Sequence, residues 1–90
     1  MKSNYLVCYD IADEARLHRV FKYLKERGFH VQYSVFHLKL TWQELQELKL
    51  DLKALIKEEE DDIRIYPLPL SPKVFVLGRG NPIPDEAIVF

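Results

Sequence analysis

The chain has 90 residues, of which 48% are hydrophobic and 30% are charged, and its formal net charge is −1. This composition is typical of one folded domain, and it excludes a disordered tail and a uniformly basic nucleic-acid binder. No apolar run approaches the roughly 20 residues of a membrane span and no signal peptide is recognisable, so a cytoplasmic location without membrane partners is expected. A single cysteine, Cys8, excludes an internal disulfide and a zinc site made of several thiolates.

The charge is distributed unevenly along the chain. Residues 1–40 carry seven Lys and Arg side chains against four Asp and Glu, a net of +3, whereas residues 41–66 carry four against eight, a net of −4. One part of the molecule is therefore suited to face a polyanion such as nucleic acid.

The chain opens with a predicted strand followed by a predicted helix. Residues 5–9 form a continuous apolar run, which predicts a buried strand that ends at Asp10. Asp13 can cap the next element, and Gly28 is expected to stop it. The apolar residues between them have the spacing of an amphipathic helix: Leu17, Val20, Phe21 and Leu24. The basic residues of this helix lie off that stripe: Arg16, Arg19, Lys22 and Lys25.

Residues 29–40 have a strand-like pattern that changes phase. Apolar residues occupy odd positions up to Val35 and even positions from Phe36, which predicts a bulge or a break near residues 35–36. Thr41 and Glu44 then form a capping box for a second amphipathic helix, which extends to about residue 56.

The rest of the chain predicts an acidic solvated loop and two more strands. The loop covers residues 58–62, and the strands cover residues 63–66 and 73–77, joined by a proline-rich turn. This order predicts an α+β ferredoxin-like sandwich over residues 1–80, with an antiparallel sheet and both helices on one face. The other face would be uncovered, and residues 87–90 are apolar. Both features predict a homodimer that packs sheet to sheet, in which residues 81–90 carry an exchanged terminal strand onto the partner.

Asp10 is the main candidate for chemistry. A carboxylate at the carboxyl end of a buried strand is a common position for a working residue, although a turn-forming or helix-capping aspartate is an equal alternative. A lone aspartate is a poor Mg²⁺ site, and a two-fold axis near Asp10 would supply a second carboxylate. The histidines, in contrast, lack metal-ligand spacing and are expected to be ordinary helix or strand residues: His18, His30 and His37.

Several motifs together resemble the CRISPR-associated protein 2 family, the small dimeric proteins of prokaryotic adaptive immunity that work in spacer acquisition. The sequence Tyr9-Asp10-Ile11 follows the first strand, VQYSVF occupies residues 31–36, and Arg-Ile-Tyr-Pro occupies residues 64–67. Two arginines and a glycine lie between the first two motifs at matching positions: Arg16, Arg19 and Gly28.

The resemblance implies a ferredoxin-like homodimer in which Asp10 of both protomers binds Mg²⁺ or Mn²⁺. It implies a metal-dependent endonuclease on RNA or DNA whose nuclease positions are Tyr9, Asp10, Arg16 or Arg19, and Phe36. Nucleic acid would be bound by four basic side chains: Arg16, Arg19, Lys22 and His30. The resemblance also implies a partnership with two dimers of the CRISPR integrase, between which the protein holds foreign DNA. His30 and His37 stand where the family often has a basic and an acidic residue, respectively.

Three functions therefore remain in competition. The first is metal-dependent phosphodiester cleavage at Asp10. The second is a non-catalytic adaptor that holds duplex DNA in the integrase complex through salt-sensitive contacts from the basic helix. The third is a ferredoxin-like domain that regulates another protein or binds a small ligand.

Overall fold

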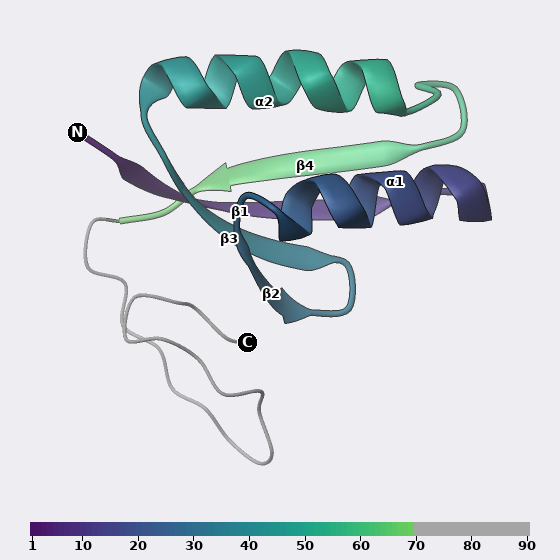
Figure 1. Cartoon of the computed structure of the whole chain (residues 1–90), viewed down its shortest axis with the longest axis horizontal. Helices are drawn as coiled ribbons and strands as arrows, with labels where there is room; N and C mark the ends of the chain where they lie inside the picture. Colours follow the sequence, from purple (N-terminus) through teal and green to yellow (C-terminus); the bar gives the residue numbers. More distant parts are fainter. Residues whose placement is uncertain (70–90) are drawn as a thin grey trace.

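Six elements make up the part of the chain that the structure describes, residues 1–69 of a computed structural model (Figure 1). They are β1 (Ser3–Asp10), α1 (Glu14–Lys25), β2 (Phe29–Gln32), β3 (Val35–Leu40), α2 (Trp42–Leu55) and β4 (Asp62–Pro67). The strands form one antiparallel sheet in the order β2-β3-β1-β4. The predicted α+β fold, with its antiparallel sheet and two helices, is confirmed.

Both helices pack on the same face of this sheet. Along β1, Val7 and Tyr9 point to that face, and along β3 Phe36 and Leu38 do so. These side chains form one buried cluster with residues of both helices: Val20 and Leu24 of α1, and Leu45, Leu48 and Leu52 of α2. The buried residues of each helix lie three or four positions apart, so they line one side of it. That side packs on the sheet, and the opposite side of the helix is exposed to solvent.

The opposite face carries the alternate side chains of the central strands. Asn4, Leu6 and His37 point there, and each is at most 6% exposed. His37 Nε2 lies 3.1 Å from Asn4 Oδ1, so two polar groups are paired among these buried residues. At these positions the face is buried, which differs from the expected uncovered face, and the homodimer stays a prediction.

Helix caps follow the sequence signals closely. The Asp13 side chain accepts a hydrogen bond from the Arg16 backbone N–H at 2.9 Å and begins α1. Thr41 and Glu44 exchange both bonds of the predicted capping box, at 3.1 and 2.8 Å, and begin α2. Both predicted caps are confirmed.

Gly28 follows the end of the first helix, as expected, and has a second role. Helix α1 ends at Lys25, and the Gly28 N–H donates to the Leu24 carbonyl at 2.8 Å. A Cβ at position 28 would lie 2.6 Å from Leu38 Cγ and 2.7 Å from the His37 carbonyl oxygen. Glycine is therefore required because the chain passes directly against β3.

The predicted break in the 29–40 region is present, slightly earlier than expected. Strands β2 and β3 are separated by a turn at Tyr33 and Ser34, and the register shifts between His30 and Gln32. Tyr33 has φ 43°, in the left-handed region that L residues rarely adopt. Across the bulge, the even-numbered residues His30 and Gln32 pair with β3 residues of opposite parity, Phe36 and Val35, so the side-chain alternation of β2 shifts by one residue.

The acidic run at residues 58–62 is not wholly solvated, so that expectation is wrong at two positions. Asp61 is buried, and Asp62, although exposed to solvent, already belongs to β4. The expected strand at residues 73–77 and the tail at 81–90, with their domain boundary, lie outside the described residues. Within residues 1–69, neither helix is long and apolar enough to cross a bilayer.

Candidate metal site and nucleic-acid interface

Asp10 occupies the last position of the central strand β1. It is exposed, and its Cα pairs in register with that of Asp62 on β4. Asp62 accepts a hydrogen bond from Arg64 Nε at 3.0 Å, whereas the Asp10 carboxylate makes no hydrogen bond or ion pair within residues 1–69. Asp10 is thus an unengaged carboxylate held on a strand with paired neighbours on both sides.

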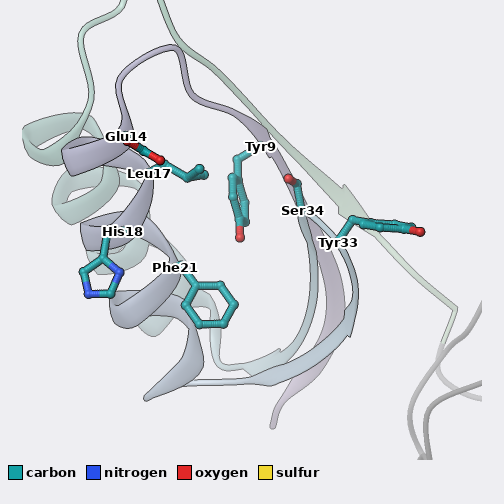
Figure 2. Close-up of a pocket in the computed structure, with 7 residues that line it drawn as sticks. All are labelled: Tyr9, Glu14, Leu17, His18, Phe21, Tyr33 and Ser34. Carbon is teal, nitrogen blue, oxygen red and sulfur yellow. The ribbon is translucent and has the colours of Figure 1, made fainter.

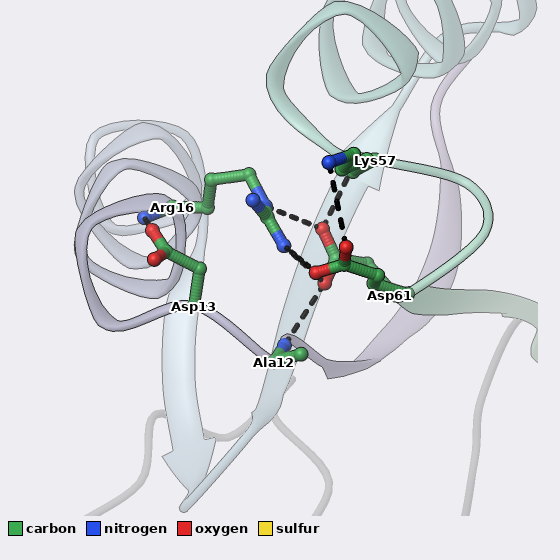
Figure 3. Close-up of polar contacts among 6 residues, drawn as sticks. Ala12, Asp13, Arg16, Lys57 and Asp61 are labelled. Carbon is green, nitrogen blue, oxygen red and sulfur yellow. Dashed lines mark hydrogen bonds and ion pairs between the residues drawn. The ribbon is translucent and has the colours of Figure 1, made fainter.

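The neighbouring Asp61 is fully engaged. Its carboxylate accepts from Arg16 Nε at 2.8 Å, from the Ala12 backbone N–H at 2.9 Å and from the Lys57 backbone N–H at 2.9 Å (Figure 3). Glu60 adds a second carboxylate on Arg16, at 3.1 Å. The Arg16 guanidinium holds the pKa of Asp61 well below its usual range. Asp61 is therefore structural and fastens the start of α1 to the loop before β4.

Among the described carboxylates at this end, Asp10 is free to bind a divalent metal. Among residues 1–69, no group of three or more His, Cys, Asp or Glu side chains is arranged to hold a metal ion. Asp62, opposite Asp10, is already paired with Arg64, whereas Mg²⁺ is usually held by one or two free carboxylates while it keeps several waters. The residues present therefore fit a water-rich Mg²⁺ site, in which Asp10 is the free ligand.

Tyr9 and Phe36 lie on the helix-covered face, away from Asp10. Successive strand residues point to opposite faces, and the Asp10 side chain consequently leaves β1 on the other side from Tyr9. The Tyr9 and Phe36 rings stack with centroids 6.2 Å apart, and the His30 ring stacks on Phe36 at 4.8 Å. The Phe21 ring meets Phe36 edge to face at 5.5 Å. The structure thus brings three predicted site residues together, and separates them from Asp10.

Phe36 is the centre of this aromatic cluster and is 0% exposed. A side chain without exposed surface cannot touch nucleic acid in this conformation. Its contacts instead fix the rings of Tyr9 and His30, so its geometry is that of a positioning residue.

Tyr9 lines a hollow of about 390 Å³ between α1 and the β2–β3 turn (Figure 2). The helix contributes Glu14, Leu17, His18 and Phe21, and the turn contributes Tyr33 and Ser34. The Tyr9 backbone N–H donates to the Ser34 carbonyl at 3.1 Å, which ties the turn to β1. Burial raises the pKa of the Tyr9 phenol, so it stays protonated at neutral pH.

The basic candidates differ in availability. Arg19 and Lys22 are exposed on α1 and make no ion pair within the described part of the chain. Arg16 is instead bound to Asp61 and Glu60, and its side chain is 18% exposed. The His30 ring is packed in the aromatic cluster, and its Nε2 donates to the Tyr33 carbonyl oxygen.

The sequence of this chain matches a known protein family. Residues 3–72 match the family model described as CRISPR associated protein Cas2. The chain belongs to the Cas2 family. It is 54% identical over 90 residues to the CRISPR-associated endoribonuclease Cas2 2 of Thermodesulfovibrio yellowstonii, covering 100% of this chain and 99% of the relative.

Solved structures agree with the Cas2 fold. A crystal structure of a hypothetical Thermus thermophilus protein superimposes with a TM-score of 0.82 at 37% identity, covering 90% of this chain and 96% of the other. Streptococcus pyogenes Cas2 superimposes with a TM-score of 0.68 at 37% identity, covering 73% of this chain and 86% of the other. The sequence-based resemblance to this family is confirmed.

Two features of this Cas2-family chain were missed at the sequence level. The sequence pattern predicts a solvated loop at Asp61, because the Arg16 that it binds lies 45 residues away along the chain. The sequence pattern also does not predict the lining of the hollow, because it assigns Phe21 to the core and His18 to an ordinary helix position. The helical spacing of Glu14, Leu17, His18 and Phe21 was the available signal, since residues three and four apart share one face.

Proposed function

We propose that this chain is a metal-dependent endonuclease on RNA or DNA that works in CRISPR spacer acquisition in the cytoplasm. The observation that carries the proposal is the unengaged Asp10 carboxylate at the end of the central strand. A rigid strand gives such a group the precise placement that catalysis needs. The endoribonuclease name of the Thermodesulfovibrio yellowstonii relative supports the same activity.

In the proposed active form, two protomers form a homodimer, with exchanged terminal strands, that brings together Asp10 of each. These carboxylates would hold Mg²⁺ or Mn²⁺, which when bound polarises a phosphate oxygen and supplies an activated water. Arg19 and Lys22 contact phosphates and neutralise their charge. Tyr9 touches the substrate, and Phe36 positions Tyr9.

The decisive experiment replaces Asp10 by Asn, which keeps the size and removes the charge. Cleavage of single-stranded RNA and of duplex DNA is measured with Mg²⁺ and with EDTA. Asp10→Asn abolishes the Mg²⁺-dependent cleavage and leaves the thermal unfolding temperature intact. The matched control is Asp62→Asn, which removes a carboxylate that Arg64 already neutralises and retains most of the activity. Cleavage by Asp10→Asn at the parent rate contradicts the proposal.

A second function is favoured by a separate observation, the exposed basic surface of α1 at Arg19 and Lys22. In this alternative the dimer is a non-catalytic adaptor that holds foreign DNA between integrase dimers. An adaptor binds duplex DNA equally well with Asp10→Asn, and the purified parent shows no Mg²⁺-dependent cleavage. Measuring both properties on the same preparation separates the two functions.

A further inference from the structure

The hollow beside Tyr9 is a second site, on the face of the sheet opposite to Asp10. Among residues 1–69, its wall contains no Lys or Arg side chain, and the formal charge there is the carboxylate of Glu14. Such a site disfavours a phosphate group, because the nearest full charge has the same sign. The rings of Tyr9, His18 and Phe21 instead offer apolar faces to a flat molecule.

The Tyr9 hydroxyl points into this hollow without a partner (Figure 2). The side chain is 6% exposed, yet its hydroxyl makes no hydrogen bond within residues 1–69. No fully buried side-chain nitrogen or oxygen of the described residues lacks a partner, so the Tyr9 hydroxyl keeps some exposed surface, and Tyr9 lines the hollow. Buried phenols usually have a hydrogen-bond partner, and here the place for it is open to a ligand.

We propose that this hollow binds the base of an unpaired nucleotide, an inference that rests on the proposed action on nucleic acid. A base is planar and apolar on its faces and carries hydrogen-bond donors and acceptors on its edge. Its faces match the aromatic wall, its acceptors match the Tyr9 hydroxyl, and its amino or imino N–H groups match Glu14. The volume of about 390 Å³ lies in the usual range of small-ligand sites.

The rim provides a further aromatic surface for the same strand. Tyr33 is 83% exposed at the turn, and its backbone is held in the left-handed region. Non-glycine residues occupy that region only where surrounding contacts hold them there, and the bond from His30 to the Tyr33 carbonyl is such a contact. An exposed ring beside a base site gives a neighbouring unpaired base a face on which to stack.

This arrangement selects unpaired over paired nucleic acid. Inside a duplex the bases are stacked and cannot enter a side pocket unless they are flipped out, which costs a few kcal/mol. Single-stranded RNA or DNA presents its bases freely. The hollow therefore adds affinity for single strands, whereas the basic side chains of α1 contact the phosphates of either form.

The test measures binding without cleavage, in buffer that lacks divalent metal. A labelled single-stranded RNA decamer, its duplex and a decamer of abasic sugars are titrated against the parent and Tyr9→Phe. Tyr9→Phe binds the single strand about three- to tenfold more weakly, as expected for one lost hydrogen bond. Its affinity for the duplex and the abasic strand equals that of the parent, and its salt dependence is unchanged.

Tyr5→Phe is the matched control, since Tyr5 lies on the same face of the same strand and does not line the hollow. It binds all three ligands as the parent does. A second experiment adds a nucleoside monophosphate as a competitor. It displaces the decamer only weakly if the hollow binds a base that belongs to a longer single-stranded nucleic acid. Tight, Tyr9-dependent binding of the monophosphate, without binding of the decamer, would overturn the proposal in favour of a free-nucleotide site.

Failure of this inference is distinguishable from failure of the proposed function. Equal binding of the single strand by Tyr9→Phe and the parent overturns the base site, while metal-dependent cleavage at Asp10 stands or falls separately. A parent protein that neither binds nor cleaves nucleic acid overturns both.

Discussion

Arg16 on α1 and Asp61 directly before β4 form an ion pair with 2.8 Å between Nε and Oδ2, and the Asp61 side chain is completely buried. The same carboxylate accepts two backbone N–H groups, from Ala12 and Lys57. A single side chain therefore joins the β1–α1 connection to the α2–β4 connection. Both connections flank Asp10, so this pair holds the end of the molecule that carries the candidate metal ligand.

Replacing Asp61 by Asn is expected to lower the melting temperature by roughly 5–15 °C, because it leaves the Arg16 guanidinium without its buried partner. Thermal unfolding followed by circular dichroism measures the change. Asp62→Asn is the control, since its pair with Arg64 is exposed on both sides and contributes little. Equal melting temperatures for the two variants would contradict a structural role for Asp61.

The same pair gives a pH dependence of stability with a defined sign. Arg16 lowers the pKa of Asp61 in the folded protein, so the pair stabilises the fold wherever the carboxylate is ionised. That contribution is fully present above the ordinary aspartate pKa of about 3.9, and it is lost as the pH falls toward the lower folded value. Asp61→Asn should therefore show a shallower loss of stability on acidification than the parent. Parallel curves of unfolding free energy against pH would contradict this assignment.

The double variant Arg19→Ala, Lys22→Ala is expected to weaken binding of all nucleic-acid sequences. Each lost phosphate contact reduces the slope of log affinity against log salt by roughly 0.7–0.9. Fluorescence anisotropy across a salt series measures the slope. Lys49→Ala with Lys53→Ala removes two exposed cations from α2 as a control for net charge. If the two double variants give the same slope, the basic face of α1 is not the interface.

Arg16→Ala should behave differently from the α1 surface variants. The Arg16 side chain is largely buried against Asp61 and Glu60, so its loss lowers the melting temperature more than it changes the salt slope. Both quantities are measured on the same protein. A normal melting temperature together with a reduced salt slope would instead assign Arg16 to phosphate binding, as the sequence-level expectation has it.

Gly28→Ala is expected to destabilise the fold by about 1–3 kcal/mol, the usual cost of overpacking. The new methyl group would overlap Leu38 Cγ and the His37 carbonyl oxygen, and the latter is backbone that cannot rotate away. Urea denaturation measures the free energy of unfolding. Glu26→Ala, at an exposed position just before it, should change this free energy by no more than about 0.5 kcal/mol. An unchanged stability of Gly28→Ala would show that β3 can move aside.

Phe36→Leu is expected to cost about 1–2 kcal/mol of stability and to reduce activity, because it removes the ring on which Tyr9 and His30 stack. Phe29→Leu, a half-buried control outside the cluster, has a smaller effect on activity. The two variants are compared by urea denaturation and by cleavage. Full stability of Phe36→Leu with complete loss of activity would mean that Phe36 contacts the substrate.

Local signals in the sequence were sufficient for most of the fold. The caps at Asp13 and Thr41 were predicted correctly because capping depends on residues three positions apart. The strand break was predicted from the odd and even positions of the apolar residues alone, and it was placed a few residues late. Two irregularities interrupt this alternation, a bulge at His30–Gln32 and a turn at Tyr33. The odd–even pattern of apolar residues cannot show where the strand breaks when a bulge and a turn both alter it.

Contacts between distant parts of the chain were beyond this kind of prediction. Nothing in residues 58–62 distinguishes Asp61 from its acidic neighbours until the fold brings it to Arg16. The opposite orientation of Tyr9 and Asp10, in contrast, follows from strand alternation and could have been read directly. The family resemblance grouped both residues as nuclease positions, and that grouping concealed the difference in face.

The opposite orientation of these two neighbours also bears on how such a protein changes over generations. In the roles proposed above, Asp10 is needed for cleavage and the adjacent Tyr9 binds an unpaired base. Their side chains lie on opposite faces of the sheet, so one can be replaced without disturbing the other. A descendant protein in which Asp10 is replaced loses cleavage and keeps the binding of unpaired bases, without any rearrangement of the fold. Nuclease and scaffold are then neighbouring states of one protein, separated by a single substitution.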